Sequence, residues 1–205
     1  MFLVLKMGIG KPSESLRRVW IVIHGPEVPE GEKQNAEGIA QYLRNKLNIV
    51  RVLPADAQAL DLLARFCNFV VVGGPYANEW AFNLNNYVQP RYQIEVTREK
   101  TADESWGDYV RSGAVKVPGF LKDDVPYAGR PGVGLIGKGS QPYPRARPLQ
   151  IIFVSGMDYG DTCTMGKAFR ENANKGLYSC TYPPITYADP CPPDEAKSYS
   201  LITDP

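Results

Sequence analysis

Residues 18–90 alternate between two hydrophobic periodicities, and this alternation constrains the fold more than any other feature of the chain. The apolar run at residues 19–23 is typical of a strand that is buried on both faces, and residues 49–53 and 69–72 predict two further strands. Each run is followed by a segment in which apolar residues recur every three or four positions, as they do along one side of a helix. The order strand, helix, strand, helix, strand, helix predicts right-handed crossovers and a parallel sheet.

The helical period disappears between residues 91 and 150. Residues 92–97 alternate like a half-buried strand, and residues 114–117 are a candidate partner strand. We therefore expect a β-rich insertion over about residues 91–135, attached to a mostly parallel sheet.

A fourth pair of strand and helix is expected after the insertion. Residues 149–154 form another apolar run, and Thr162 is a suitable N-cap for the helix that follows. The last part of the chain carries many prolines and tyrosines and little periodicity, which predicts an irregular segment. We divide the chain into a single α/β domain, residues 1–177, and a C-terminal extension, residues 178–205.

Positive and negative charges nearly cancel in this chain. It has 23 Lys and Arg against 22 Asp and Glu, so little excess positive charge is available for a nucleic-acid backbone or an anionic membrane surface. The longest apolar runs are far shorter than the roughly 20 residues of a membrane helix. The opening segment lacks the pattern of a signal peptide. The default expectation is a cytoplasmic protein, or a cell-surface protein if the chain is processed or is a fragment.

Two glycine-containing loops follow predicted strands, at residues 73–78 and 155–162. Each places glycine next to the strand and a capping residue at the next helix, which leaves backbone N–H groups and a positive helix end for an anion. The loops predict a site for a small anionic ligand, such as a nucleotide or a sugar phosphate. The candidate ligand-binding residues are Gly73, Gly74, Pro75, Asn78, Gly156, Asp158, Gly160 and Thr162. The alternative is that the glycines only allow sharp turns, while Asn78 and Thr162 only cap helices.

Candidate catalytic residues are few. His24 is the only histidine, so a hydrolase would use it as the base, with Ser155 or Cys163 as the nucleophile and Asp158 or Asp161 as the orienting group. No Gly-x-Ser-x-Gly turn surrounds either nucleophile. We therefore lean away from an enzyme.

No metal or cofactor is predicted. The two aspartates of the second loop are close enough to share a hard cation, but two carboxylates in one loop are more often solvated. The four cysteines include no Cys-x-x-Cys pair, as a zinc site would require.

The C-terminal extension has two features of its own. Cys180 and Cys191 flank a proline-rich loop and are candidates for a disulfide in an oxidising compartment or a hyperthermophile. Tyrosines such as Tyr182, Tyr187 and Tyr199 provide rigid contact surface, which predicts self-association through this extension. The alternative is that the extension packs on its own domain.

Two segments resemble a known group of proteins. Residues 68–78, NFVVVGGPYAN, are similar to the VVGGPxxN segment of archaeal S-layer proteins and related small prokaryotic α/β domains. Residues 133–136, VGLI, and residues 151–162, IIFVSGMDYGDT, resemble the second signature of this group, a GLI strand and then VxGxxxxGT before a helix. The group has adjacent Gly and Thr where Asp161 intervenes here.

The resemblance covers about residues 66–175 and implies a Rossmann-like domain without an established catalytic residue. We therefore expect a Rossmann-like three-layer α/β sandwich that acts as a non-catalytic module in assembly or recognition, as in an S-layer. The first alternative is a binder of a small anion at the loops of Gly73 and Gly156. The second alternative is a hydrolase that uses His24.

Overall fold

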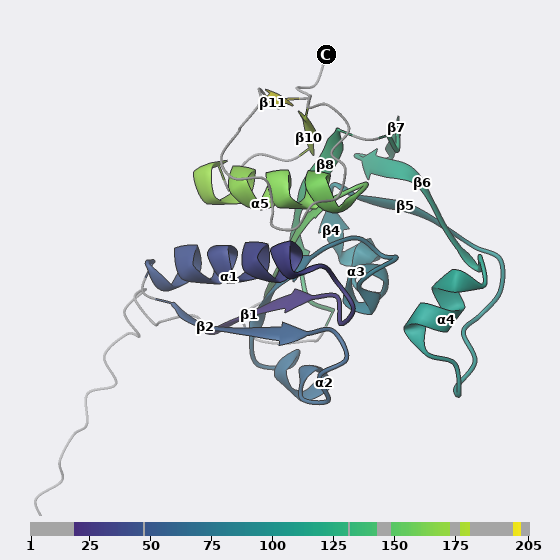
Figure 1. The fold of residues 1–205 in the computed structure, drawn as a ribbon, viewed down its shortest axis with the longest axis horizontal. Coiled ribbons are helices and arrows are strands. Elements are labelled where there is room, and N and C mark those ends of the chain that lie inside the picture. Colours follow the sequence, from purple (N-terminus) through teal and green to yellow (C-terminus); the bar gives the residue numbers. More distant parts are fainter. Residues whose placement is uncertain are drawn as a thin grey trace, which may run out of the picture.

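The larger of two β-sheets organises the protein. The computed structural model describes residues 19–46, 48–130, 132–142, 149–172, 177–180 and 199–201. The sheet has the strand order β11-β10-β8-β9-β3-β1-β2, and β4 also pairs with β8 (Figure 1). Its strands are β1 (Val19–His24), β2 (Ile49–Pro54), β3 (Asn68–Val72), β4 (Val88–Gln89), β8 (Val133–Ser140), β9 (Gln150–Gly156), β10 (Leu177–Cys180) and β11 (Tyr199–Leu201).

The two faces of this sheet are covered differently. Helices α1 (Glu30–Arg44) and α5 (Tyr159–Asn172) lie side by side on one face, where they pack against Trp20 and Val22 of β1 (Figure 1). The other face receives Ile21 and Ile23. The described helices that pack on that face are short: α2 (Leu60–Leu63), α3 (Glu79–Asn83) and α4 (Trp106–Arg111), which contribute Leu60, Ala81 and Tyr109. The 3-10 helix η1 (Asn85–Tyr87) follows α3. The alternation of β1 side chains between two buried faces explains its continuous apolar run.

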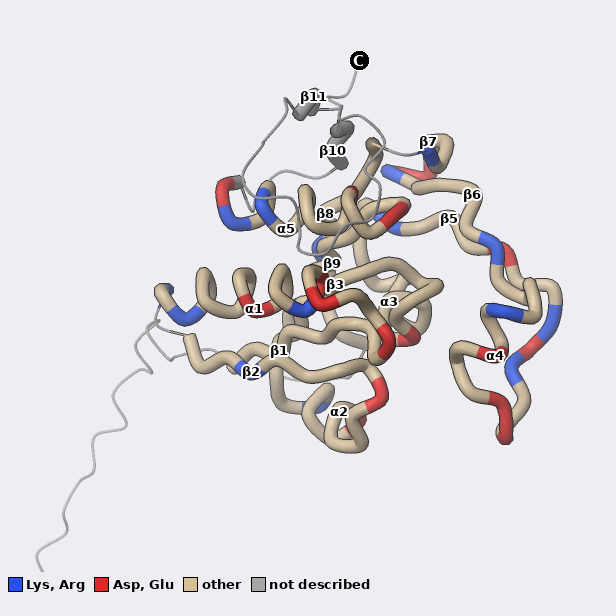
Figure 2. Tube along the Cα trace, in the orientation of Figure 1, with Lys and Arg blue, Asp and Glu red and all other residues tan. Residues whose placement is uncertain are grey.

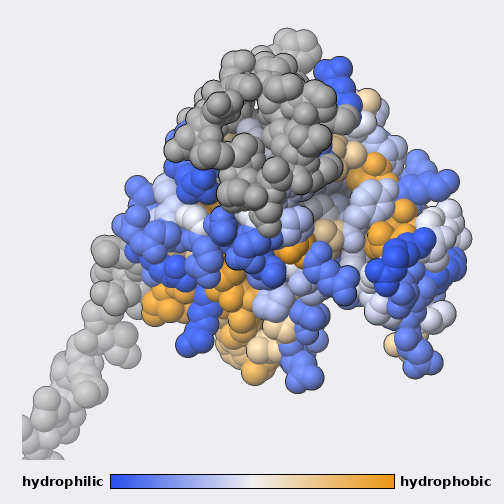
Figure 3. All heavy atoms as spheres, in the orientation of Figure 1, coloured by the Kyte–Doolittle hydropathy of each residue, from blue (hydrophilic) through white to orange (hydrophobic). Residues whose placement is uncertain are grey.

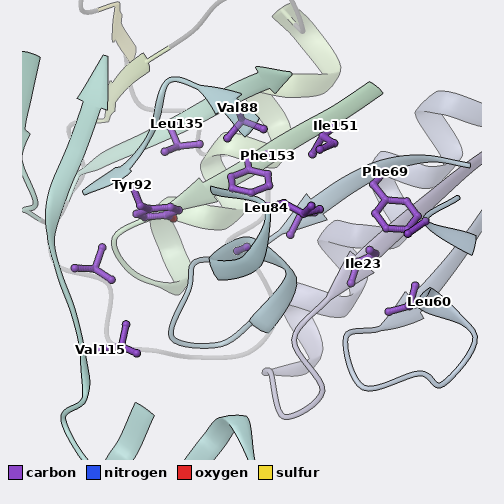
Figure 4. Packing of buried hydrophobic residues seen from close by; sticks show 14 of the residues in the cluster. Ile23, Leu60, Phe69, Leu84, Val88, Tyr92, Val115, Leu135, Ile151 and Phe153 are labelled. Atoms are coloured by element: carbon purple, nitrogen blue, oxygen red, sulfur yellow. The ribbon is translucent and has the colours of Figure 1, made fainter. Parts of the chain in front are cut away.

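A second sheet packs on the face of the main sheet that carries Ile21, Ile23 and the short helices. It contains β5 (Arg91–Val96), β6 (Val115–Lys122) and β7 (Val125–Ala128), all antiparallel, and helix α4 (Trp106–Arg111) joins β5 to β6. The predicted pairing of residues 92–97 with 114–117 is confirmed, with Val96 opposite Val115. Tyr92 of β5 lies beside Leu135 and Phe153 of the main sheet (Figure 4). The two sheets therefore share one hydrophobic core.

The predicted fold class, a Rossmann-like three-layer sandwich with a mostly parallel sheet, is wrong. Strands β9, β3, β1 and β2 are parallel, but β8 runs antiparallel to β9, β4 and β10, so the main sheet is mixed. Strands β5, β6 and β7 form a separate antiparallel sheet, which does not pair with the main sheet by strand hydrogen bonds. The connection from β8 to β9 spans only residues 141–149, which is too short for the crossover that a parallel neighbour requires.

The C-terminal extension is not irregular throughout. Strand β10 pairs antiparallel with β8, and β11 pairs antiparallel with β10. Cys180 ends β10, whereas its candidate disulfide partner Cys191, together with Tyr182 and Tyr187, lies outside the described residues. Self-association through this extension stays a prediction.

Several large apolar side chains are exposed at β2 and near α2. Ile49 of β2, Leu62 of α2 and Phe66 are all more than half exposed. Figure 3 shows hydrophobic residues on the lower side of the molecule, where Figure 1 places β2 and α2. Among the described helices, none combines the length and the apolar composition that a bilayer span needs.

Asn78 ties together the carboxyl ends of two central strands. Its side chain is fully buried, and its Nδ2 donates to the carbonyl of Ile23 at 3.3 Å and to that of Val72 at 2.9 Å. Its Oδ1 accepts from the backbone N–H of Trp80 at 3.0 Å and so caps α3. Because all three backbone groups depend on one amide, Asn78 holds the loop after β3 in place.

Replacing Asn78 by alanine should destabilise the protein by about 3 kcal/mol, because it removes the helix cap and leaves two strand-end carbonyls without this donor. Urea unfolding measures the loss. The matched control is Asn83→Ala at the exposed end of α3, which should change stability by less than about 0.5 kcal/mol. Equal losses in the two variants would contradict the role of Asn78.

Candidate functional site

A pocket of about 220 Å³ opens beyond the carboxyl ends of the central strands. Its walls come from the loop after β1, the loop after β3, the end of β9 with the start of α5, and from β5 and β6 of the second sheet. Most wall residues are apolar or aromatic: Val28, Pro29, Pro75, Tyr76, Ala77, Val117, Met157 and Tyr159. The carboxyl groups are those of Glu27, Glu32 and Asp158. Acidic positions also mark the start of α1 and the loop before it in Figure 2.

The structure brings both predicted glycine loops to this pocket. Its lining includes five of the eight residues named from the sequence: Gly74, Pro75, Gly156, Asp158 and Thr162.

The other three residues named from the sequence have different positions. Asn78 is buried and donates hydrogen bonds to the ends of β1 and β3, as described above. Gly160 lies in the first turn of α5, where its carbonyl accepts from the hydroxyl of Thr164 at 2.9 Å. Gly73 stands behind the pocket wall, against Glu32.

Glu32 is the least expected group in the pocket. Its side chain is 4% exposed, and its Oε1 is buried without a hydrogen-bond partner among the described residues. Burial raises the pKa of this carboxyl from 4.5 to about 7. The protein therefore holds a desolvated, unsatisfied carboxyl group at the wall of a concave site.

The start of α1 explains why Glu32 lacks a partner. A glutamate at the third position of a helix commonly reaches back to the backbone N–H of the N-cap residue. The N-cap of α1 is Pro29, which has no N–H. The Glu32 carboxyl lies close to the backbone of Gly73. Only a glycine leaves room for it there, because a Cβ on residue 73 would lie 2.5 Å from Oε1 of Glu32. Gly73 also has a φ of 89°, which other residues adopt at a cost.

Tyr92 and Ser155 form a buried hydroxyl pair beside Gly74. The Tyr92 hydroxyl is hydrogen-bonded to Ser155 and donates to the carbonyl of Gly156 at 3.2 Å. Burial, with the nearby Glu32 and Asp161 carboxyls, raises the pKa of Tyr92 far above its ordinary value. A Cβ at Gly74 would lie 3.0 Å from the Tyr92 hydroxyl, so the glycine admits this ring to the wall.

The backbone donors of the second loop are largely taken by the protein itself. Thr162 Oγ1 accepts from the N–H of Gly156 at 3.1 Å, and Asp158 Oδ1 accepts from the N–H of Asp161 at 2.8 Å. Asp161 in turn accepts from the N–H of Gly132. The described lining contains no lysine, arginine or histidine. This composition does not favour the anion that the loops suggested in the sequence.

The residues of the hydrolase alternative do not assemble around the pocket. His24 is buried outside the lining, with its Nδ1 2.6 Å from the carbonyl of Gly25. Ser155 has no exposed surface. Cys163 takes part in a disulfide, so it offers no thiol. Asp158 and Asp161 do not belong to a cluster of three or more metal-binding side chains within the described residues.

Comparisons with protein-family models, with curated proteins and with solved structures each found no match. The similarity to S-layer proteins stays a prediction that rests on the sequence segments alone.

Glu32 and Tyr92 are among the residues of the pocket wall that were not predicted from the sequence. Glu32 resembles an ordinary acidic residue in a first helical turn, although Pro29 three positions earlier was a signal that its usual partner is absent. Tyr92 comes from the second sheet, and no sequence signal places that sheet against the glycine loops.

Glu32 should make stability depend on pH in an unusual direction. Between pH 4.5 and about 7 the folded protein holds a proton that the unfolded chain has lost, so the free energy of unfolding should fall as pH rises through this window. Glu32→Gln removes the titration and should be more stable than the wild type at pH 8, by about 3 kcal/mol at most. Urea unfolding at pH 5 and pH 8 tests this. A variant that is equally destabilised at both pH values would contradict it.

Proposed function

We propose that this protein is a recognition module that binds a small, largely apolar molecule in the pocket between the two sheets without transforming it. One observation carries the proposal: the pocket combines apolar walls with a buried carboxyl group whose Oε1 has no partner in the described protein. An unsatisfied buried polar group lowers stability, and such a group is commonly retained where a ligand completes its hydrogen bonds.

The dimensions and chemistry of the site support this function. Its volume of about 220 Å³ is below that of pockets for drug-sized ligands, which begin at roughly 300 Å³, so the ligand would be a small metabolite. Apolar walls with a few converging polar groups are typical of ligand sites. The base and the nucleophiles expected for hydrolysis, His24, Ser155 and Cys163, are outside the lining, which supports binding without a reaction.

Titration of the labelled full chain with a library of small apolar fragments, followed by NMR, tests the proposal. Bound fragments should shift the amide signals of Gly74, Ala77 and Gly156 together, because these residues come from two separate loops that both line the pocket. The amides of Leu62 and Phe66, beside exposed apolar side chains at α2, are the internal control. Shifts confined to α2, or no shifts at any site, would refute a role for the pocket in recognition.

A further inference from the structure

We infer that the ligand of this pocket is an organic ammonium ion, with a positively charged amine head placed at Glu32 and Asp158 and an apolar body along the tyrosine-lined wall. This inference rests on the proposed function and adds the chemical class of the ligand.

The charge of the lining points to a cation. Three of the residues that line the pocket of about 220 Å³, Glu27, Glu32 and Asp158, carry carboxyl groups, and the described lining contains no basic residue. The two helices that begin at the pocket carry acidic residues in their first turns. Their positive ends are thus compensated by the protein, and an anion would meet net negative charge.

The unsatisfied oxygen of Glu32 requires a donor. The carboxyl torsion of a glutamate is soft, so rotation can present either oxygen to the pocket. An ammonium group carries only donors, and its hydrogen bonds to a carboxylate are roughly twice as strong as those between neutral groups. A neutral hydroxyl would supply one donor but would leave the carboxylate charge uncompensated at a desolvated site.

The walls select an organic amine over a bare metal ion. Tyr76, Tyr92, Tyr159 and Met157 line the same space as the carboxyl groups. Aromatic faces attract organic cations, and methionine packs readily against apolar groups. A hard metal ion would need several oxygen ligands around one point. The described residues contain no cluster of three or more metal-binding side chains.

Three probes with one ring and different head groups test the charge directly. The full chain is titrated at pH 8 with benzylamine, benzyl alcohol and sodium benzoate, and the amide signals of Gly74 and Gly156 are followed by NMR. Benzylamine should bind about tenfold more tightly than benzyl alcohol, because its bond to a carboxylate is charge-assisted. Benzoate should bind more weakly than either.

Two variants assign the effect to Glu32. Glu32→Gln keeps the shape but removes the charge, and should weaken benzylamine binding about tenfold or more while benzyl alcohol changes less than about twofold. The matched control is Glu30→Gln in the same helical turn, where the carboxyl is exposed and pairs with Lys33 at 3.7 Å. It should leave all three affinities unchanged.

The outcomes separate this inference from the proposed function. If benzyl alcohol or benzoate binds as well as benzylamine, or if Glu32→Gln leaves benzylamine binding unchanged, the ammonium assignment is overturned while the pocket remains a binding site. If neither the probes nor the fragment library shifts the pocket amides, the proposed function fails and the inference fails with it.

Discussion

Tyr92 of the second sheet packs against and hydrogen-bonds to the main sheet, and the wall of the pocket depends on this contact. Its ring is buried in the shared core and packs against Phe120 of the second sheet, with ring centroids 5.1 Å apart. Its hydroxyl bonds to the end of β9, and its backbone exchanges two hydrogen bonds with the side chain of Asn85. One residue thus holds β5 against the carboxyl edge of the main sheet. Without that placement the glycine loops would border open solvent on this side.

The sequence predicted the parallel half of the fold better than the rest. Strands that are buried on both faces give apolar runs, as in β1, β3 and β9. The more exposed β2 was placed by the helical segments before and after it, since long connections between parallel strands require crossovers. Periodicity does not report strand direction, and the antiparallel β8 was overlooked as a partner of β9. Its glycines reflect close backbone approach: a Cβ at Gly139 would lie 1.7 Å from the carbonyl oxygen of Tyr87 on the neighbouring segment. Such contacts depend on tertiary structure and leave little trace in local pattern.

The position of the candidate site was easier to predict than its chemistry. Loops at the carboxyl ends of parallel strands meet at one edge, so Gly74 and Gly156 were expected to converge. Whether their backbone donors stay free depends on side chains that approach from elsewhere. In the second loop, Thr162 accepts from the N–H of Gly156 and Asp158 from that of Asp161, and this is visible only in three dimensions. The anionic ligand inferred from helix ends therefore lost its main support once the local hydrogen bonds were known.

Glu32 shows how a stability cost can indicate a binding site. A carboxyl at the third helical position usually gains a backbone partner, but Pro29 cannot provide one. An exposed carboxyl can form its hydrogen bonds with water, as that of Glu30 in the same turn can. The carboxyl of Glu32 is buried and cannot do so. Glu32 is instead desolvated beside Gly73, whose missing Cβ leaves room for the carboxyl, so the fold keeps an unfavourably buried group at this point. Its place at the wall of a pocket favours a role in binding over chance packing, because a substitution of Glu32 by a neutral residue would remove the cost of the buried carboxyl.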